Sequence, residues 1–156
     1  MDRHDVALES AKRNIQAAEH MLNVTFKITA EPRVLIAVCT RVMESFKDTI
    51  AAVLLYEYSK KRIPAFNEDF DSMFSIFRAR QSRRYRMSQD YSSVISRIRE
   101  IIIQHKKSPV EFSKDGRFVI CSERYKLKVI SPEIIKGYVE KAKLFIEEVE
   151  GMVKNA

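Results

Sequence analysis

The chain has 156 residues, of which 46% are hydrophobic and 31% are charged, a balance typical of one globular domain and not of a disordered chain. Only three glycines and four prolines interrupt it, which favours long helices over a β-sandwich or barrel. Because charged residues begin at position 2 and no apolar run reaches about 18 residues, the sequence predicts a cytoplasmic protein with no signal peptide and no membrane-spanning helix.

Two long amphipathic helices are predicted in the first part of the chain. Apolar residues spaced three and four apart predict the first helix over residues 4–23, and residues 24–30 are expected to form a connector. Pro32 suits the first turn of a second helix, which ends before Pro64. The apolar stripe of this second helix consists of Leu35, Val38, Val42, Phe46, Ile50 and Val53.

The next two predicted helices are shorter. A third helix is expected to begin after Asn67, with acidic residues in its first turn. Its buried side is predicted to consist of Phe70, Met73, Phe74 and Phe77. Ser88 is a candidate N-cap for a fourth helix, whose apolar stripe runs from Tyr91 to Ile102.

The pattern of apolar residues changes after Pro109 from the helical period to a period of two. Residues 110–130 are therefore predicted to form a small antiparallel β insert, with turns near 114–116 and 122–123. Ser131 followed by Pro132 predicts the start of a last helix. The predicted fold is all-α, an antiparallel up-and-down bundle of about five helices in a single domain over residues 1–156, with the β insert before the last helix.

The cysteines, histidines and glycines do not form a known cofactor motif. Cys39 and Cys121 are single cysteines, and we predict that they are buried, reduced thiols. The sequence contains no set of Cys and His with zinc spacing, no Glu-x-x-His pair and no glycine-rich phosphate loop. We therefore expect no metal and no cofactor, which argues against metal-dependent and nucleotide-dependent enzymes.

Positive charge is concentrated between residues 78 and 128. This region holds 14 of the 28 Lys and Arg residues but only five acidic residues, so its net charge is +9. The rest of the chain, with 14 basic and 16 acidic residues, is nearly neutral. A basic region attracts polyanions over about 8 Å at physiological salt, which makes nucleic acid a candidate partner.

Five arginines with one tyrosine among them fall within nine residues of this region. Arg binds phosphate through two parallel hydrogen bonds. On a regular helix these side chains point in almost every direction. If the helix instead ends near Arg80, residues 81–86 form an exposed loop. Such a loop suits single-stranded nucleic acid, because Tyr85 is then available to stack on a base. The candidate nucleic-acid-binding residues are Arg78, Arg80, Arg83, Arg84, Tyr85, Arg86, Lys106, Lys107, Lys114 and Arg117. The alternative is a solvated surface whose arginines pair with acids on neighbouring helices.

An Arg and a His are separated by five residues at Arg99 and His105, and by six at Arg13 and His20. With the alanine-rich N-terminal helices, this spacing resembles the HEPN superfamily of helical bundles, which includes nucleases with an Arg-x(4–6)-His motif completed across a homodimer. The segment from His105 to Cys121 also resembles small uncharacterised archaeal proteins. The HEPN resemblance implies a homodimeric, metal-independent ribonuclease in which His105 is the general acid/base and Arg99 holds the phosphate.

The helical geometry limits that interpretation of Arg99 and His105. On one continuous helix the two residues lie about 120° apart around the axis and about 9 Å apart along it. They can act together only across an interface or through a break in the helix. His105 also follows Ile98 by seven residues on the apolar stripe, so a partly buried structural role is the alternative.

The sequence therefore predicts a nucleic-acid-binding protein, with RNA favoured, that uses residues 78–86 and 106–117. The first alternative is the dimeric ribonuclease. The second is a non-enzymatic homo-oligomer or an adaptor that binds an acidic protein. A winged-helix arrangement of the third helix, fourth helix and hairpin on duplex DNA is the last alternative.

Overall fold

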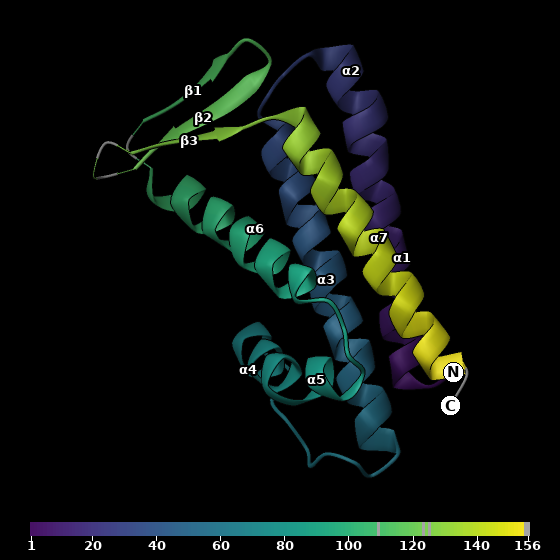
Figure 1. Ribbon diagram of the computed structural model, residues 1–156. Coiled ribbons are helices and arrows are strands. Elements are labelled where there is room, and N and C mark those ends of the chain that lie inside the picture. Colours follow the sequence, from purple (N-terminus) through teal and green to yellow (C-terminus); the bar gives the residue numbers. More distant parts are fainter. Residues whose placement is uncertain (109, 123, 125, 155–156) are drawn as a thin grey trace.

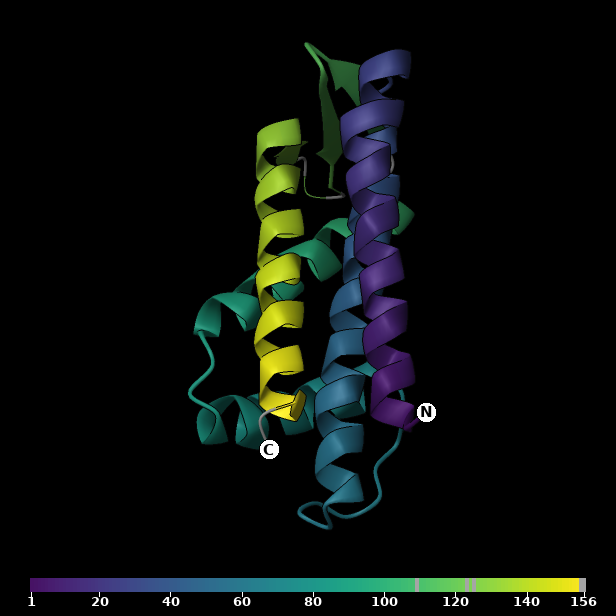
Figure 2. The same ribbon diagram turned by 90° about the vertical axis from the view of Figure 1, so that its right-hand side faces the viewer.

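The computed structural model describes residues 1–108, 110–122, 124 and 126–154 (Figure 1). In this part of the chain, five helices form a bundle and a small three-stranded antiparallel sheet precedes the last helix, which confirms the predicted fold class. Figure 2 shows the first, second and last helices side by side along the length of the molecule. None of the described helices is both long enough and apolar enough to cross a membrane.

The first helix is longer than predicted. Helix α1 (Arg3–His20) continues through the π-helical turn η1 (Met21–Thr25) into α2 (Phe26–Thr29). The prediction of a connector over residues 24–30 was wrong, because no glycine or proline interrupts this stretch. The helix ends only at Ala30, which adopts the left-handed conformation with φ of 52°.

The second helix ends in a capping motif that bears on the site described below. Helix α3 (Val34–Ser59) is followed by Lys61 at a φ of 59°. The N–H of Arg62 donates to the carbonyl of Glu57 at 3.0 Å, and the N–H of Lys61 donates to the carbonyl of Tyr58 at 3.0 Å. These two bonds form a Schellman motif, which turns the chain so that Arg62 comes back over Glu57.

The third helix consists of α4 (Phe70–Ile76), the π-helical turn η2 (Phe77–Gln81) and α5 (Ser82–Arg84). Helix α6 (Gln89–Lys107) follows, and the Ser88 hydroxyl accepts a hydrogen bond from the N–H of Asp90 at 3.1 Å, which confirms the predicted N-cap. In Figure 1, α6 crosses α3 at an angle.

The β insert has the predicted boundaries. Strands β1 (Val110–Lys114), β2 (Arg117–Cys121) and β3 (Leu127–Ile130) pair antiparallel in the order β1-β2-β3. Asp115 and Gly116 both have positive φ, as a tight type I′ hairpin turn requires. The second predicted turn, 122–123, lies partly outside the described residues. Helix α7 (Pro132–Lys154) then returns along the bundle.

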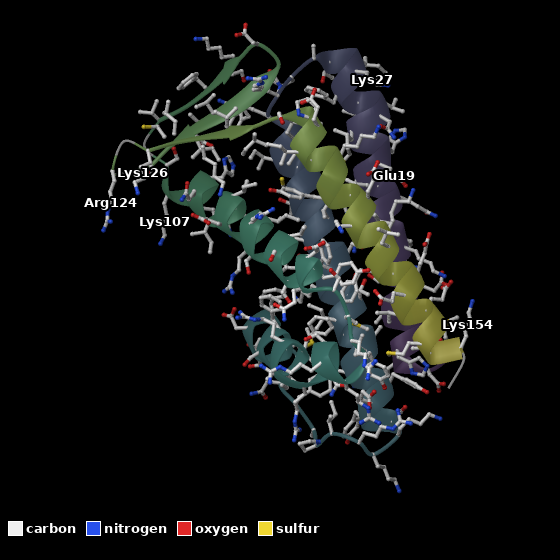
Figure 3. All side chains as sticks on the ribbon, in the orientation of Figure 1. Glu19, Lys27, Lys107, Arg124, Lys126 and Lys154 are labelled. Carbon is white, nitrogen blue, oxygen red and sulfur yellow. The ribbon has the colours of Figure 1, made fainter. Side chains whose placement is uncertain are left out.

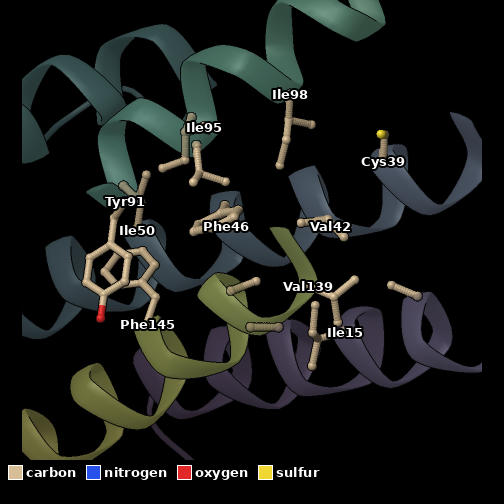
Figure 4. Packing of buried hydrophobic residues seen from close by; sticks show 14 of the residues in the cluster. Ile15, Cys39, Val42, Phe46, Ile50, Tyr91, Ile95, Ile98, Val139 and Phe145 are labelled. Atoms are coloured by element: carbon tan, nitrogen blue, oxygen red, sulfur yellow. The ribbon is translucent and has the colours of Figure 1, made fainter. Parts of the chain in front are cut away.

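The core lies between α1, α3, α6 and α7 (Figure 4). Phe145 of α7 is fully buried and its ring centroid lies 5.8 Å from that of Phe46, 5.4 Å from that of Phe77 and 4.7 Å from that of Tyr91. Helices α3, α6 and α7 and the turn η2 therefore meet at one side chain. Cys39 is buried in the same core as predicted, and burial raises the pKa of its thiol to about 12. Cys121 is half-buried.

Candidate nucleic-acid interface

The cluster of arginines between residues 78 and 86 is helical up to Arg84, so the alternative of an exposed loop over residues 81–86 is wrong. The side chains point in several directions, as the helical period requires. Arg78 and Arg83 line one cleft, whereas Arg80 and Arg84 line a different cavity together with Arg83. The cluster is therefore divided between two sites, and Arg83 belongs to both.

The larger site, which we call the serine–arginine cleft, lies between the third helix and the first half of α6 and has a volume of about 850 Å³. Its polar lining is dominated by two residue types. The arginines are Arg78, Arg83, Arg97 and Arg99, and the serines are Ser75, Ser82, Ser92, Ser93 and Ser96. Both types donate hydrogen bonds to oxygen atoms, so the cleft is suited to an anionic ligand rich in oxygen acceptors.

One wall of the cleft is the polar face of α6. Gln89, Ser92, Ser93, Ser96 and Arg97 recur at steps of three, one, three and one, which places them on one side of the helix. The buried residues of α6, from Tyr91 to Ile101, occupy the opposite side. The prediction from sequence missed this wall, although the spacing of the serines along a helix with a clear apolar stripe was a usable signal.

The charge in the cleft is strongly unbalanced. Asp71 is the only acidic residue among those that line it, and its carboxylate oxygen lies 2.5 Å from a guanidinium nitrogen of Arg99. Within the described residues, Arg78, Arg83 and Arg97 have no carboxylate within 4 Å. Arg78 instead lies over the ring of Phe74, 5.1 Å from its centroid, and this contact holds the guanidinium at the cleft wall.

Arg84 and Tyr85 make contacts with a buried acid. The Tyr85 hydroxyl donates to Oε1 of Glu57, and Nη1 of Arg84 lies 3.9 Å from Oε2. Glu57 is fully buried in the last turn of α3. The alternative in which arginines of the cluster pair with acids on neighbouring helices thus describes Arg84, and the ring of Tyr85 is half-buried beside this carboxylate.

The second group of predicted basic residues lies elsewhere on the molecule. Lys106 and Lys107 end α6, and Lys114 and Arg117 flank the β-hairpin turn. All four are exposed. Helix α6 has 19 residues and is therefore about 28 Å long, which separates this group from the arginine cluster. Figures 1 and 2 show the sheet at one end of the molecule and α4 and α5 at the other, and Figure 3 shows Lys107 on the sheet side.

Arg99 and His105 have separate partners. Helix α6 runs without a break through both positions, so their separation is that of a regular helix. Arg99 binds Asp71 of α4 and lies over the ring of Phe70 at 5.4 Å. The Nδ1 atom of His105 lies 2.6 Å from Oε2 of Glu111, on β1. Within one chain, the structure does not bring the guanidinium and the imidazole together.

Comparison of the chain with family models, with curated proteins and with solved structures gave no match.

Proposed function

We propose that the chain binds single-stranded nucleic acid, with RNA favoured, in the serine–arginine cleft. The observation that carries the proposal is that Arg78, Arg83 and Arg97 line one open cleft without acidic partners. An exposed guanidinium in this position is free to bind a phosphate through two hydrogen bonds. The cleft volume of about 850 Å³ is within the range of natural ligand sites.

The serines support RNA over DNA as the preferred ligand. A serine hydroxyl both donates and accepts hydrogen bonds, and so does the ribose 2′-hydroxyl that distinguishes RNA. Ser92, Ser93 and Ser96 follow one face of α6 beside the arginines. A strand whose phosphates bind the arginines would therefore bring its riboses near these hydroxyls.

Lys106, Lys107, Lys114 and Arg117 would extend this interface for a longer strand. Because α6 begins at the cleft and ends beside these residues, a strand that follows α6 would pass from one basic group to the other. Contacts of this kind are made to phosphate and carry no sequence information. We therefore expect affinity for short strands to depend on the cleft and affinity for long strands to depend on both groups.

Loss of two cleft arginines should weaken RNA binding and reduce its dependence on salt. We expect wild-type affinity for a labelled single-stranded RNA to fall steeply between about 50 and 200 mM salt, because each phosphate contact releases counterions. In the double variant Arg78→Gln and Arg97→Gln, the slope of log affinity against log salt should decrease by about 1.4, at about 0.7 per contact for single strands. Native gel shifts at several salt concentrations measure both quantities.

The matched control removes two positive charges outside the cleft. Lys27 and Arg33 are exposed and form no ion pair within the described residues, so the double variant Lys27→Gln and Arg33→Gln should keep the wild-type slope. An equal loss in both double variants would assign binding to net charge and reject the cleft. No gel shift even at 50 mM salt would reject nucleic acid and direct attention to an acidic protein partner or a second copy of this chain.

A second candidate function, a metal-independent ribonuclease of HEPN-like type, is favoured by one contact. The carboxylate of Glu111 at Nδ1 of His105 holds the imidazole in the tautomer that leaves Nε2 available for proton transfer. The phosphate would be held by Arg99 of a second copy of the chain, in a homodimer.

The ribonuclease proposal predicts RNA fragments on denaturing gels in the presence of a chelator. His105→Ala should abolish cleavage and leave the gel shift intact. Glu111→Gln should reduce cleavage, because the tautomer of the His105 imidazole is then no longer fixed by a negatively charged carboxylate. Cleavage that persists unchanged in His105→Ala would sink the proposal.

A further inference from the structure

A second cavity lies beside the serine–arginine cleft, where the end of α3 meets η2 and α5. It has a volume of about 470 Å³, and we call it the arginine pocket. Its lining consists of Arg62, Ile63, Arg80, Gln81, Arg83 and Arg84. Four of these six residues carry a guanidinium group, and no acidic residue is among them.

Two of the four guanidinium groups are held in place from behind. Nη1 of Arg62 lies 3.6 Å from Oε1 of the buried Glu57, and Nη1 of Arg84 lies 3.9 Å from Oε2. Nη1 of Arg62 also donates to the Tyr85 hydroxyl at 3.3 Å. The Schellman motif after α3 fixes the backbone of Arg62 above the same carboxylate. The carboxylate of Glu57 therefore attracts both guanidinium groups from outside the pocket lining, without a hydrogen bond to Arg84.

The other polar groups of the pocket are unpaired. Within the described part of the chain, Arg80 and Arg83 have no carboxylate within 4 Å. Gln81 is only 2% exposed, and its Oε1 atom is buried without a hydrogen-bond partner. Buried side-chain oxygens almost always have a partner, so Gln81 is an unsatisfied polar residue at the wall of this cavity.

From these groups we infer that the arginine pocket binds a phosphate monoester, the terminal phosphate of a strand whose backbone occupies the serine–arginine cleft. A monoester carries close to two negative charges at neutral pH and three terminal oxygens, whereas a phosphodiester carries one charge. The pocket has four guanidinium groups and only one nearby carboxylate, so its positive charge matches the two charges of a monoester better than the single charge of a diester.

The two cavities are joined by Arg83, which lines both. Within the π-helical turn η2, Arg78 faces the cleft while Arg80 and Gln81 face the pocket. A strand in the cleft would therefore reach the pocket at one of its ends. This inference rests on the proposed function, because the terminal phosphate in the arginine pocket belongs to the strand that is proposed to bind in the cleft.

The test uses one RNA sequence with three kinds of end: a 5′-phosphate, a 3′-phosphate, or hydroxyls at both ends. We expect one of the phosphorylated RNAs to bind at least about tenfold more tightly than the hydroxyl form, a ratio typical of an added charge-assisted contact. Which RNA it is identifies the end of the strand. Arg80→Gln should abolish this preference and leave salt-dependent binding, whereas Arg97→Gln should weaken all three RNAs and retain the preference. Arg33→Gln removes a positive charge remote from both cavities, so it should change neither the affinity for RNA nor the preference for a phosphorylated end.

The outcomes separate this inference from the proposed function. Equal affinity for the three RNAs, with all three weakened by Arg97→Gln, would overturn the arginine pocket and leave the cleft in place. If no RNA binds, the pocket is tested alone with a nucleoside 5′-monophosphate in an NMR titration. Shifts that disappear in Arg80→Gln but persist in Arg33→Gln would support the pocket, and an absence of shifts would overturn it.

Discussion

Replacement of Phe145 by alanine is expected to lower the free energy of unfolding by about 3–5 kcal/mol. Phe145 is fully buried and its ring contacts Phe46, Phe77 and Tyr91, with the closest centroid at 4.7 Å. Truncation removes these contacts and leaves a cavity at the point where helices from three parts of the sequence meet. The surrounding backbone is rigid and can fill this cavity only in part. The loss should be visible in urea unfolding followed by circular dichroism.

The neighbouring residue provides the matched control. Leu144 lies on the same helix and is 50% exposed, so Leu144→Ala should change stability by no more than about 0.5 kcal/mol. If Phe145→Ala does not fold, the smaller truncation Phe145→Leu should still show a loss in the same direction. A loss from Phe145→Ala no greater than that from Leu144→Ala would contradict the packing of α7 on η2 and α6.

The same side chain links stability to the proposed site. Phe77 belongs to the third helix and Tyr91 to α6, and these two elements form the two walls of the serine–arginine cleft. Phe145 packs against both from the core side. A variant that loosens this contact should therefore let the third helix and α6 vary more in their relative position. RNA binding should weaken as a result, even at a temperature where the variant is still folded.

The helices and the hairpin could be predicted because their signals are local. Apolar residues at helical spacing marked α1, α3, α6 and α7, and the change to a period of two after residue 109 marked the sheet. The extension of the first helix to Thr29 was missed, although no glycine or proline interrupts residues 21–29, and its exact end could not be predicted. Its end depends on the left-handed conformation of Ala30, a residue that carries no signal for that conformation.

The site could be predicted only in part, because it is made by packing between distant segments. Charge density placed Arg78, Arg83 and Arg97 in the basic region, but Arg97, which has few basic neighbours in the sequence, was not among the candidate binding residues. Arg84 and Tyr85 appeared equivalent to the other members of the cluster until the fold placed the buried Glu57 beside them. The position of an acid on another helix decides which arginines are free, and no local pattern contains that information.

The Cys39 thiol is expected to react with a thiol reagent at pH 8 at least about a thousandfold more slowly in the folded protein than in the unfolded chain. Burial raises the pKa of the Cys39 thiol from 9.0 to about 12, so the reactive thiolate becomes about tenfold rarer with each unit of the increase. Cys39 is also fully buried in the hydrophobic core, which excludes the reagent (Figure 4). Cys121, at the end of β2, is half-buried and should react in the folded protein.

Mass spectrometry of the single-thiol variant Cys121→Ser measures this difference directly, since all labelling must then occur at Cys39. Labelling should require unfolding and should become rapid in concentrated urea. The same raised pKa predicts a loss of stability in alkali. Below pH 9 the Cys39 thiol is protonated in both the folded and the unfolded chain. Between pH 9 and about 12 it ionises in the unfolded chain but not in the folded protein, and this difference favours unfolding. Labelling of Cys39 in the folded protein at the rate seen in concentrated urea would contradict the burial of α3 against α6 and α7, on which both proposed cavities depend.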